Sequence, residues 1–191
     1  MAANIPLTRC AWCGQDALYQ AYHDTEWGVP VRDDHKMFEM LLLETFQAGL
    51  SWITVLRKRE NFRRVFLDFV PEKVAAMPDD ALEAALTDPG IIRNRLKVYA
   101  ARSNAQAFLQ VAQTHGSFCH YLWSYVDHTP VKNAWRSTSE LPARTDLSDR
   151  ISKDLKKQGF KFVGSTVVYA HLQASGLVND HITDCFRYNS L

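Results

Sequence analysis

Three consecutive stretches decide the fold: SDRISKDLKKQG (148–159), FKFVG (160–164) and STVVYAHLQASG (165–176). Each of the two longer stretches begins with a serine, whose hydroxyl can accept a hydrogen bond from a free amide at the start of a helix. Each ends with a glycine, which readily adopts the left-handed conformation that closes a helix. The short stretch between them allows only a tight connection. Together they predict two helices joined by a glycine-bounded hairpin.

Helical spacing of apolar residues extends outward from this hairpin through most of the chain. Further helices are predicted over 34–47, over 52–66, from Pro71, from Pro78, over 93–113 and over 117–126, with a last short helix capped by Asn179 or Asp180. The stretch 127–147 has little periodicity and is predicted to be an ordered surface loop. No pair of strands is predicted, so the expected fold class is all-α.

Length and composition place the chain among ordinary folded proteins. Its 191 residues are 47% hydrophobic and 23% charged, which excludes a disordered chain and favours one compact unit over residues 1–191. No apolar run approaches the ~20 residues needed to cross a bilayer. The first nine residues lack the cationic and apolar regions of a secretory signal, so we expect a cytoplasmic protein without membrane contact.

The net charge of +1, from 22 basic and 21 acidic residues, does not by itself indicate a polyanionic partner. Three local groups of basic residues could still contact phosphate: Arg57, Lys58, Arg59, Arg63 and Arg64; Arg93, Arg95 and Lys97; and Lys153, Lys156, Lys157 and Lys161. Taken one at a time, each group is better explained as the solvated face of a helix.

Cysteine and histidine residues at the two ends of the chain have the spacing of metal ligands. Four cysteines in a chain without a secretory signal argue against a disulfide framework. Cys10 and Cys13 form a C-x2-C pair, His23 follows, and His181 and Cys185 would share one face of a helix. Because Zn(II) binds four nitrogen or sulfur donors, one ion could join the ends. Spacing alone favours Cys13 over His23 as the fourth ligand, and the alternative is that these are ordinary buried groups.

Several motifs, taken together, resemble those of bacterial 3-methyladenine DNA glycosylases of the constitutive type. They are RCxW (9–12), YHDxEWGVP (22–30), LExxQAGLSWITVL (43–56), GIIR (90–93), GFKFVG (159–164) and GLVNDH (176–181). They occur in the family's order and spacing, and they run from Arg9 to Cys185. The resemblance therefore covers almost the whole chain.

The resemblance implies a helix-hairpin-helix glycosylase fold with its hairpin region at about 148–176. It also implies one structural Zn(II) per chain that joins the terminal segments at about 9–24 and 179–186. The ligands carried over from the family are Cys10, His23, His181 and Cys185. In this set His23 replaces Cys13 as a ligand, and the presence of a cysteine at position 13 is a departure from the family's pattern.

The hairpin is expected to contact DNA through its backbone. The residues concerned are Gly159, Lys161 and Gly164, whose amides would face a phosphate. The centre of this hairpin departs from the usual Gly-x-Gly of the superfamily, because Lys161 and Phe162 occupy it. Gly49 and Leu50 complete the predicted DNA contacts, with Leu50 as a wedge into the gap left by a displaced base. The alternative for Leu50 is ordinary core.

An enzyme that cuts the bond between a base and its sugar must take the base out of the duplex and stack it in a pocket. Aromatic residues suited to such a pocket are Trp12, Tyr19, Tyr22, Trp27 and Trp52. Taken singly, each is better explained by core packing. The resemblance places Trp12 and Trp52 against the base and Tyr22 within hydrogen-bond reach of it.

Glu44 is the predicted catalytic residue. It lies among apolar helical neighbours, so burial is expected, and a buried carboxylate needs a partner or a raised pKa. The functional interpretation is an acceptor for the exocyclic amine of a methylated adenine, and the alternative is a carboxylate satisfied by a nearby hydroxyl. Asp180 is a second acidic candidate, which could stabilise an oxocarbenium-like sugar but is better explained as a helix cap.

The sequence thus predicts a monomeric DNA repair enzyme that acts on double-stranded alkylated DNA. It would flip out 3-methyladenine, hydrolyse the N-glycosidic bond and leave an abasic site, with free 3-methyladenine as a product ligand. Lys161 does not occupy the place of a Schiff-base lysine, so no lyase activity is expected. The alternatives are a non-catalytic, zinc-stabilised DNA-binding protein of the same fold and a zinc hydrolase. A closed site with four ligands would exclude the hydrolase.

Overall fold

The computed structural model describes residues 7–47 and 49–190. Residues 1–6, Ala48 and Leu191 lie outside this range. The expected absence of a secretory signal rests mainly on residues 1–6, which are not described. One position of the motif at 43–56, Ala48, is also not described. Among the described residues, no helix has both the length and the hydropathy that crossing a bilayer would need.

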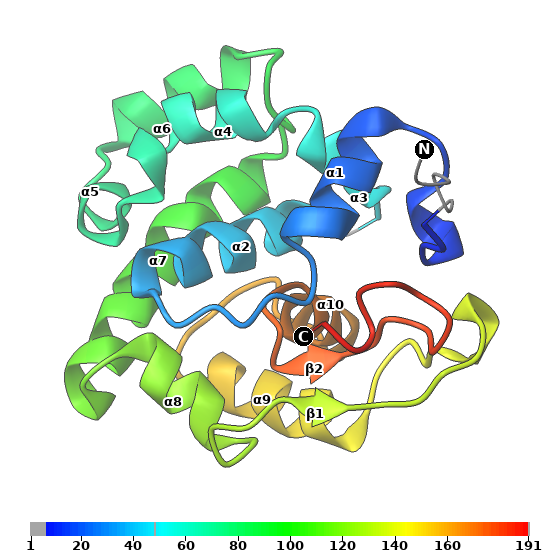
Figure 1. The fold of residues 1–191 in the computed structure, drawn as a ribbon. Coiled ribbons are helices and arrows are strands. Elements are labelled where there is room, and N and C mark those ends of the chain that lie inside the picture. The colour runs from blue at the N-terminus through cyan, green and yellow to red at the C-terminus, as the bar shows by residue number, and fades with distance from the viewer. Residues whose placement is uncertain (1–6, 48, 191) are drawn as a thin grey trace.

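Helices dominate the described residues, as the all-α prediction required (Figure 1). The α-helices are α1 (Ala17–Thr25), α2 (Asp34–Gln47), α3 (Trp52–Leu56), α4 (Arg59–Val65), α5 (Pro71–Ala75), α6 (Asp79–Thr87), α7 (Arg95–His115), α8 (Phe118–Ser124), α9 (Asp146–Lys157) and α10 (Ser165–Ala174). The 3-10 helices are η1 (Ala11–Cys13), η2 (Leu67–Phe69) and η3 (Thr138–Glu140). The predicted helix over 52–66 is two helices, because the α-helical pattern is interrupted between α3 and α4.

The predicted pair of helices is present as α9 and α10, with one shifted boundary. Thr145 caps α9 by accepting from the amide of Ser148 at 3.2 Å, and the Ser148 hydroxyl accepts from the amide of Thr145 at 2.9 Å. This reciprocal capping box starts the helix two positions before the predicted serine. In Figure 1, α10 lies between α2 and α9, and it packs against both of them.

The chain also contains a strand pair that the sequence did not predict. β1 (Val131–Lys132) and β2 (Val178–Asn179) pair in parallel, with Val131 opposite Val178. Strands of two residues are too short to show an alternating pattern, so no local signal indicates them. They tie the stretch predicted to be a loop to the residues after α10.

The predicted final helix is wrong, because turns follow β2 and no helix is assigned between Asp180 and Ser190. The interpretation of Asp180 as a helix cap is therefore also wrong. Its buried carboxylate instead accepts hydrogen bonds from four side chains, which are those of Asn133, Trp135, Tyr169 and Gln173. A carboxylate with so many donors holds the loop after β1 against α10.

The core consists of a large apolar cluster and a smaller one beside the site. The large cluster contains most of the buried phenylalanines and packs α2 against α7, α8 and α10. The smaller cluster includes Cys10, Tyr22, Trp27, Met40, Leu56, Ala174 and Cys185. Because these residues come from both ends of the chain, the smaller cluster joins the terminal segments to the helices that carry the site.

Gly176 allows the end of α10 to approach the segment 28–31 closely. The amide of Gly28 donates to the carbonyl of Ala174 at 3.2 Å, and the amide of Val31 donates to that of Ser175 at 3.0 Å. Gly176 has φ +75°, and a β-carbon on it would lie 2.5 Å from backbone atoms of Val29 and Pro30. The close approach therefore requires glycine both for conformation and for space.

Gly176→Ala should lower the free energy of unfolding by about 3 kcal/mol or more, because backbone strain and a backbone overlap add. Chemical denaturation of both proteins measures the decrease. Gly116→Ala is the matched control, since Gly116 has φ +86° but open space around its α-carbon. An equal decrease in the two variants would show that conformation alone matters at position 176.

Candidate active site

A hollow of about 160 Å³ opens between α1, α2 and α10. It is lined by Trp12, Tyr19, Tyr22, Trp27, Glu44, Gln47, Trp52, Leu141, Ala170 and Gln173. We call this hollow the aromatic pocket. It is smaller than the roughly 300 Å³ or more of pockets that hold drug-sized molecules, so it suits one small planar group.

The walls of the aromatic pocket are rings packed against one another. The ring of Trp12 lies 5.0 Å from those of Tyr19 and Trp27, measured between centroids, and Tyr22 lies 5.4 Å from Trp52. Tyr22 and Trp27 are buried, whereas Trp12, Tyr19 and Trp52 are half-buried and leave ring surface facing the hollow. The structure thus brings together all five of the predicted base-binding residues.

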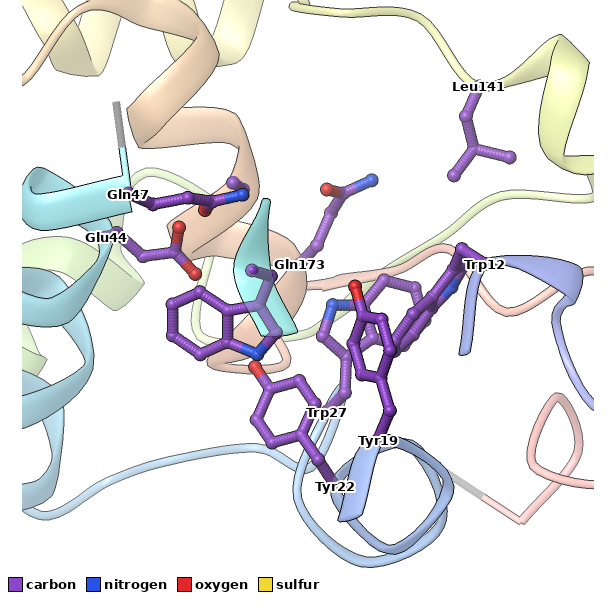
Figure 2. Close-up of a pocket in the computed structure, with 10 residues that line it drawn as sticks. Trp12, Tyr19, Tyr22, Trp27, Glu44, Gln47, Leu141 and Gln173 are labelled. Carbon is purple, nitrogen blue, oxygen red and sulfur yellow. The ribbon is translucent and has the colours of Figure 1, made fainter. Parts of the chain in front are cut away.

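Glu44 lies across the pocket from these rings. Figure 2 shows Glu44 and Gln47 on one side of the hollow and Trp12, Tyr19 and Trp27 on the other. The side chain of Glu44 is only 3% exposed, and its Oε2 has no hydrogen-bond partner among the described residues. No hydroxyl among the described residues bonds to this oxygen, which argues against the alternative for Glu44. Burial raises the pKa of the carboxyl to about 8.

The indole nitrogens of two tryptophans in the pocket are also buried without a hydrogen-bond partner. Nε1 of Trp12 and Nε1 of Trp52 are buried and have no acceptor among the described residues. A buried polar atom without a partner costs free energy, and it is commonly matched by a ligand or by water. The aromatic pocket therefore holds two unmatched donors and one unmatched carboxyl oxygen.

Gln173 is a lining residue that the sequence interpretation missed, as are Leu141 and Ala170. Its amide nitrogen donates to the carboxylate of Asp180 at 2.8 Å. Because a carboxylate only accepts hydrogen bonds, the amide of Gln173 has a fixed orientation and its oxygen is left for another donor. A glutamine near the end of the mostly apolar helix α10 was the available signal.

Gly49 and Leu50 form the turn that follows α2 beside the pocket. Gly49 has φ +83°, and the Leu50 side chain is 42% exposed, so the core alternative for Leu50 is wrong. A second hollow, lined by Glu44, Gln47, Gly49, Leu50, Thr166, Val167 and Ala170, lies beside the aromatic pocket and shares three of its residues. An apolar side chain thus projects into solvent where the pocket meets the start of α10.

The hairpin residues lie outside the aromatic pocket. Lys161 is exposed, and neither it nor Gly159 nor Gly164 is among the residues that line the hollow. A β-carbon on Gly164 would have no atom within 4 Å, so the space in front of this residue is open. The hairpin and Leu50 therefore do not line the aromatic pocket, and Leu50 lines the hollow beside it.

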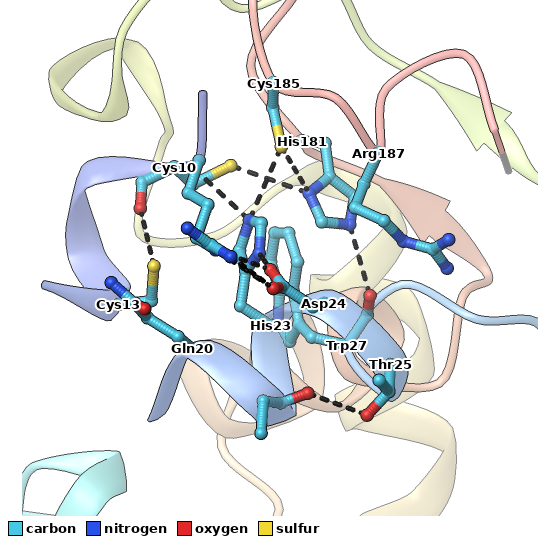
Figure 3. Close-up of polar contacts among 12 residues, drawn as sticks. Cys10, Cys13, Gln20, His23, Asp24, Thr25, Trp27, His181, Cys185 and Arg187 are labelled. Carbon is cyan, nitrogen blue, oxygen red and sulfur yellow. Dashed lines mark hydrogen bonds and ion pairs between the residues drawn. The ribbon is translucent and has the colours of Figure 1, made fainter. Parts of the chain in front are cut away.

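Four side chains from opposite ends of the chain form a group that could hold a metal ion: Cys10, His23, His181 and Cys185. All four are buried, and their ligand atoms lie within 4.8 Å of one another. Sγ of Cys185 is 3.4 Å from Nδ1 of His181 and 3.5 Å from Nε2 of His23. Cys13 is not part of this group, because its thiol points to the carbonyl of Cys10 at 3.1 Å (Figure 3). The choice of Cys13 from spacing is therefore wrong.

Both histidines of this group have a second partner that fixes the ring. Nδ1 of His23 lies 2.8 Å from the carboxylate of Asp24, which is itself paired with Arg9 at 2.7 Å. Nε2 of His181 lies 3.1 Å from the carbonyl of Trp27. These contacts leave Nε2 of His23 and Nδ1 of His181 as the nitrogens that face the sulfur atoms, in the manner usual for metal-binding histidines.

The fold and the site together define a helical protein with a small aromatic pocket and a buried acid. A family model described as methyladenine glycosylase matches residues 12–188. The chain therefore belongs to the methyladenine glycosylase family, and the resemblance inferred from the motifs is confirmed.

Individual relatives agree with this family over almost their whole length. The chain is 53% identical to DNA-3-methyladenine glycosylase 1 of Escherichia coli (strain K12), over 95% of this chain and 97% of that protein. It is 45% identical to the DNA-3-methyladenine glycosylase of Haemophilus influenzae, over 93% and 96%. A solved structure of 3-methyladenine DNA glycosylase I from Staphylococcus aureus, which concerns 3-methyladenine recognition, is 40% identical. It superposes with a TM-score of 0.92 over 95% of this chain and 97% of that one.

Proposed function

We propose that this protein is a DNA glycosylase that removes 3-methyladenine from double-stranded alkylated DNA by hydrolysis and leaves an abasic site. Glu44 acts at the bond-breaking step, and the five rings of the aromatic pocket hold the displaced base. The protein acts as a monomer, and residues 1–191 work as one catalytic unit. The observation that carries the proposal is the set of three unmatched buried polar atoms, on Trp12, Trp52 and Glu44, around one ring-sized hollow.

The charge of the lesion explains how this pocket selects it. N3-methylation makes the adenine of a nucleotide formally cationic, whereas normal adenine is neutral. In the empty pocket at neutral pH the Glu44 carboxyl is largely protonated, because its pKa is raised to about 8. A cationic base beside it favours the ionised form, which then accepts from the exocyclic amine. Normal adenine supplies no such charge, so an ionised Glu44 would remain desolvated and uncompensated.

Bond cleavage then needs little help from the protein. The cationic base is already a good leaving group, so no strong acid is required. Water attacks the oxocarbenium-like sugar, which the carboxylate of Glu44 stabilises electrostatically. No lysine is among the residues that line the aromatic pocket, which supports an enzyme that forms no Schiff base and has no lyase activity.

DNA binding is assigned to the surface around the pocket. Leu50 fills the gap left by the displaced base, and the hairpin amides near Gly159, Lys161 and Gly164 bind a backbone phosphate. The exposed position of Leu50 and the open space at Gly164 support these roles. Lys153, Lys156 and Lys157 on α9 are exposed close to the hairpin in sequence and add positive charge.

Affinity for undamaged duplex DNA should fall steeply as the salt concentration rises, because contacts with phosphates release counterions. Replacing Lys153, Lys156, Lys157 and Lys161 together by glutamine should weaken binding and flatten the salt dependence, by about 0.9 in logarithmic slope for each phosphate that is no longer neutralised. Fluorescence anisotropy over a salt series measures both quantities. The control replaces four residues of a different basic group by glutamine: Arg57 and Lys58, which precede α4, and Arg63 and Arg64 on α4. Equal slopes for the wild type and for the variant with the four lysines replaced would remove this surface from the DNA interface.

The metal of the proposal is one structural Zn(II) per chain, held by Cys10, His23, His181 and Cys185. Two sulfur and two nitrogen donors form a set that Zn(II) prefers. Zinc bonds of about 2.3 Å to sulfur and 2.0 Å to nitrogen would place tetrahedral ligand atoms of the two kinds about 3.5 Å apart. Three of the four sulfur–nitrogen pairs of this group are 3.4 to 3.6 Å apart. Since four protein ligands leave no open position, the ion has no place in the reaction and joins the two ends of the chain.

The decisive test is to incubate the protein with methylated duplex DNA and to identify the released bases chromatographically. Release of 3-methyladenine with intact abasic strands is expected, and borohydride should trap no covalent complex. DNA binding without release of any base would favour the alternative, a non-catalytic zinc-stabilised DNA-binding protein. The open aromatic pocket weighs against that alternative.

A further inference from the structure

Asn104 holds the hairpin between α9 and α10 from a distant part of the chain. It lies on α7, and its side chain is 1% exposed. Its amide nitrogen donates to the carbonyl of Lys161 at 3.0 Å, and its amide oxygen accepts from the backbone amide of the same residue at 2.7 Å. The side chain therefore pairs with one residue of the hairpin as a neighbouring strand would.

A second side chain fixes the hairpin from within the pair of helices. The hydroxyl of Ser152, buried on α9, donates to the carbonyl of Val163 at 2.6 Å. Between these two anchors Phe162 has φ +59°, so the chain turns sharply there. Two of the carbonyl groups of the loop thus point toward the protein and are occupied.

The amides that follow have no such partners. Those of Gly164, Ser165 and Thr166, at the start of α10, donate to no acceptor among the described residues. The helix geometry leaves these amides free by necessity, and the space beside the α-carbon of Gly164 is open. Their direction depends on the loop that precedes them, which is the loop that Asn104 and Ser152 hold.

We propose that Asn104 is a positioning residue for DNA binding, which orients the hairpin so that its free amides meet a backbone phosphate. The inference rests on the proposed role of the hairpin in contacting DNA. It does not require Asn104 to touch DNA, because the side chain is buried beneath the loop. The contribution of Asn104 is to keep the phosphate site formed before DNA arrives, which lowers the ordering cost of binding.

The test compares two affinities of each variant: for a duplex that carries an uncleavable abasic analogue, and for free 3-methyladenine. Asn104→Ala should bind the duplex about tenfold more weakly, since the two hydrogen bonds that orient the loop are removed, and should bind the free base within about twofold of the wild type. The single-turnover rate at saturating DNA should be unchanged, while the DNA concentration that gives half of this rate rises. Ser152→Ala, a smaller change, should shift duplex affinity in the same direction by about threefold and covers the case in which Asn104→Ala does not fold.

Gln106→Ala is the matched control, because Gln106 is on the same helix and donates to the carbonyl of Ala75 at 3.1 Å, away from the hairpin. It should leave duplex affinity unchanged. Gly164→Ala tests the hairpin directly, since a methyl group fits there without touching the protein and would occupy the space of a phosphate.

Three outcomes would overturn the proposal. If Gly164→Ala weakens duplex binding but Asn104→Ala and Ser152→Ala do not, the positioning role is overturned and the role of the hairpin in DNA binding stands. If none of the three variants changes duplex affinity, the role of the hairpin itself fails. A parallel decrease of free-base affinity in Asn104→Ala would make Asn104 a general stability residue.

Discussion

Glu44→Gln should slow excision of 3-methyladenine and weaken binding of the free base by about one to two decades. The change preserves shape but replaces a carboxylate oxygen with an amide, and hydrogen bonds in which one group is charged are worth about 1.5 to 3 kcal/mol. Single-turnover kinetics on methylated DNA and titration with 3-methyladenine measure the two effects. Full activity in the variant would remove Glu44 from the reaction.

The stability of the same variant distinguishes a functional role from a structural one. The pKa of Glu44 is about 8 in the folded protein, far above the ordinary value of a glutamate. Between those two values the folded state keeps a proton that the unfolded state releases, so rising pH destabilises the wild type by about 1.4 kcal/mol for each pH unit. This destabilisation is absent below the unfolded pKa and is complete above about pH 8. Glu44→Gln lacks it, so the variant should be the more stable protein at neutral pH. Loss of activity together with a lower melting temperature would return Glu44 to a structural role.

Removal of the metal should have the largest effect on stability. Cys185→Ser should reduce the zinc content well below one per chain and lower the melting temperature by about 10 °C or more, because a cross-link between the two ends is worth several kcal/mol. Elemental analysis and thermal melts measure these effects, and a strong chelator should produce the same melt in the wild type. The cause is that a metal bound only in the folded state adds its binding energy to folding.

Cys13→Ala is the control for this experiment, because Cys13 is a buried thiol three positions from a ligand and lies outside the group. It should keep the metal and most of the stability, whereas His23→Ala should lose both. The reverse result would make Cys13 the ligand. Wild-type protein with much less than one zinc would contradict the metal proposal altogether.

Much of the architecture could be predicted from local patterns, because most of the chain is helical and its boundaries carry strong capping residues. The hairpin was predicted from serine and glycine positions, and only the start of α9 moved, because the Thr145–Ser148 box caps it earlier. The β1–β2 pair and the absence of a last helix could not be predicted in this way. Both depend on contacts with distant residues, such as those that Asp180 makes, and these override local preference.

The site likewise contains residues that local sequence could predict and residues that only contacts between distant segments reveal. The motifs and the family resemblance identified the aromatic residues and Glu44, but each ring taken singly suited the core equally well. Only the fold shows that Trp12 and Trp52 line one hollow and that their indole nitrogens have no partner among the described residues. Gln173 was missed because its role depends on Asp180, which fixes its amide. Asn104 was missed because nothing in its neighbourhood on α7 indicates the hairpin 57 positions away.

The way the two ends meet sets the order in which a working enzyme can arise during its own synthesis. The amide of Phe186 donates to the carbonyl of Thr8 at 3.0 Å, and the group that could hold a metal spans from Cys10 to Cys185. The helices between them can pack as the nascent chain leaves the ribosome, since domains fold from the N-terminus onward. The segment that carries Trp12 on one wall of the aromatic pocket is held in place only when His181, Cys185 and Phe186 have emerged. A nascent chain that lacks the segment from His181 to Phe186 therefore has no anchor for this wall of the aromatic pocket.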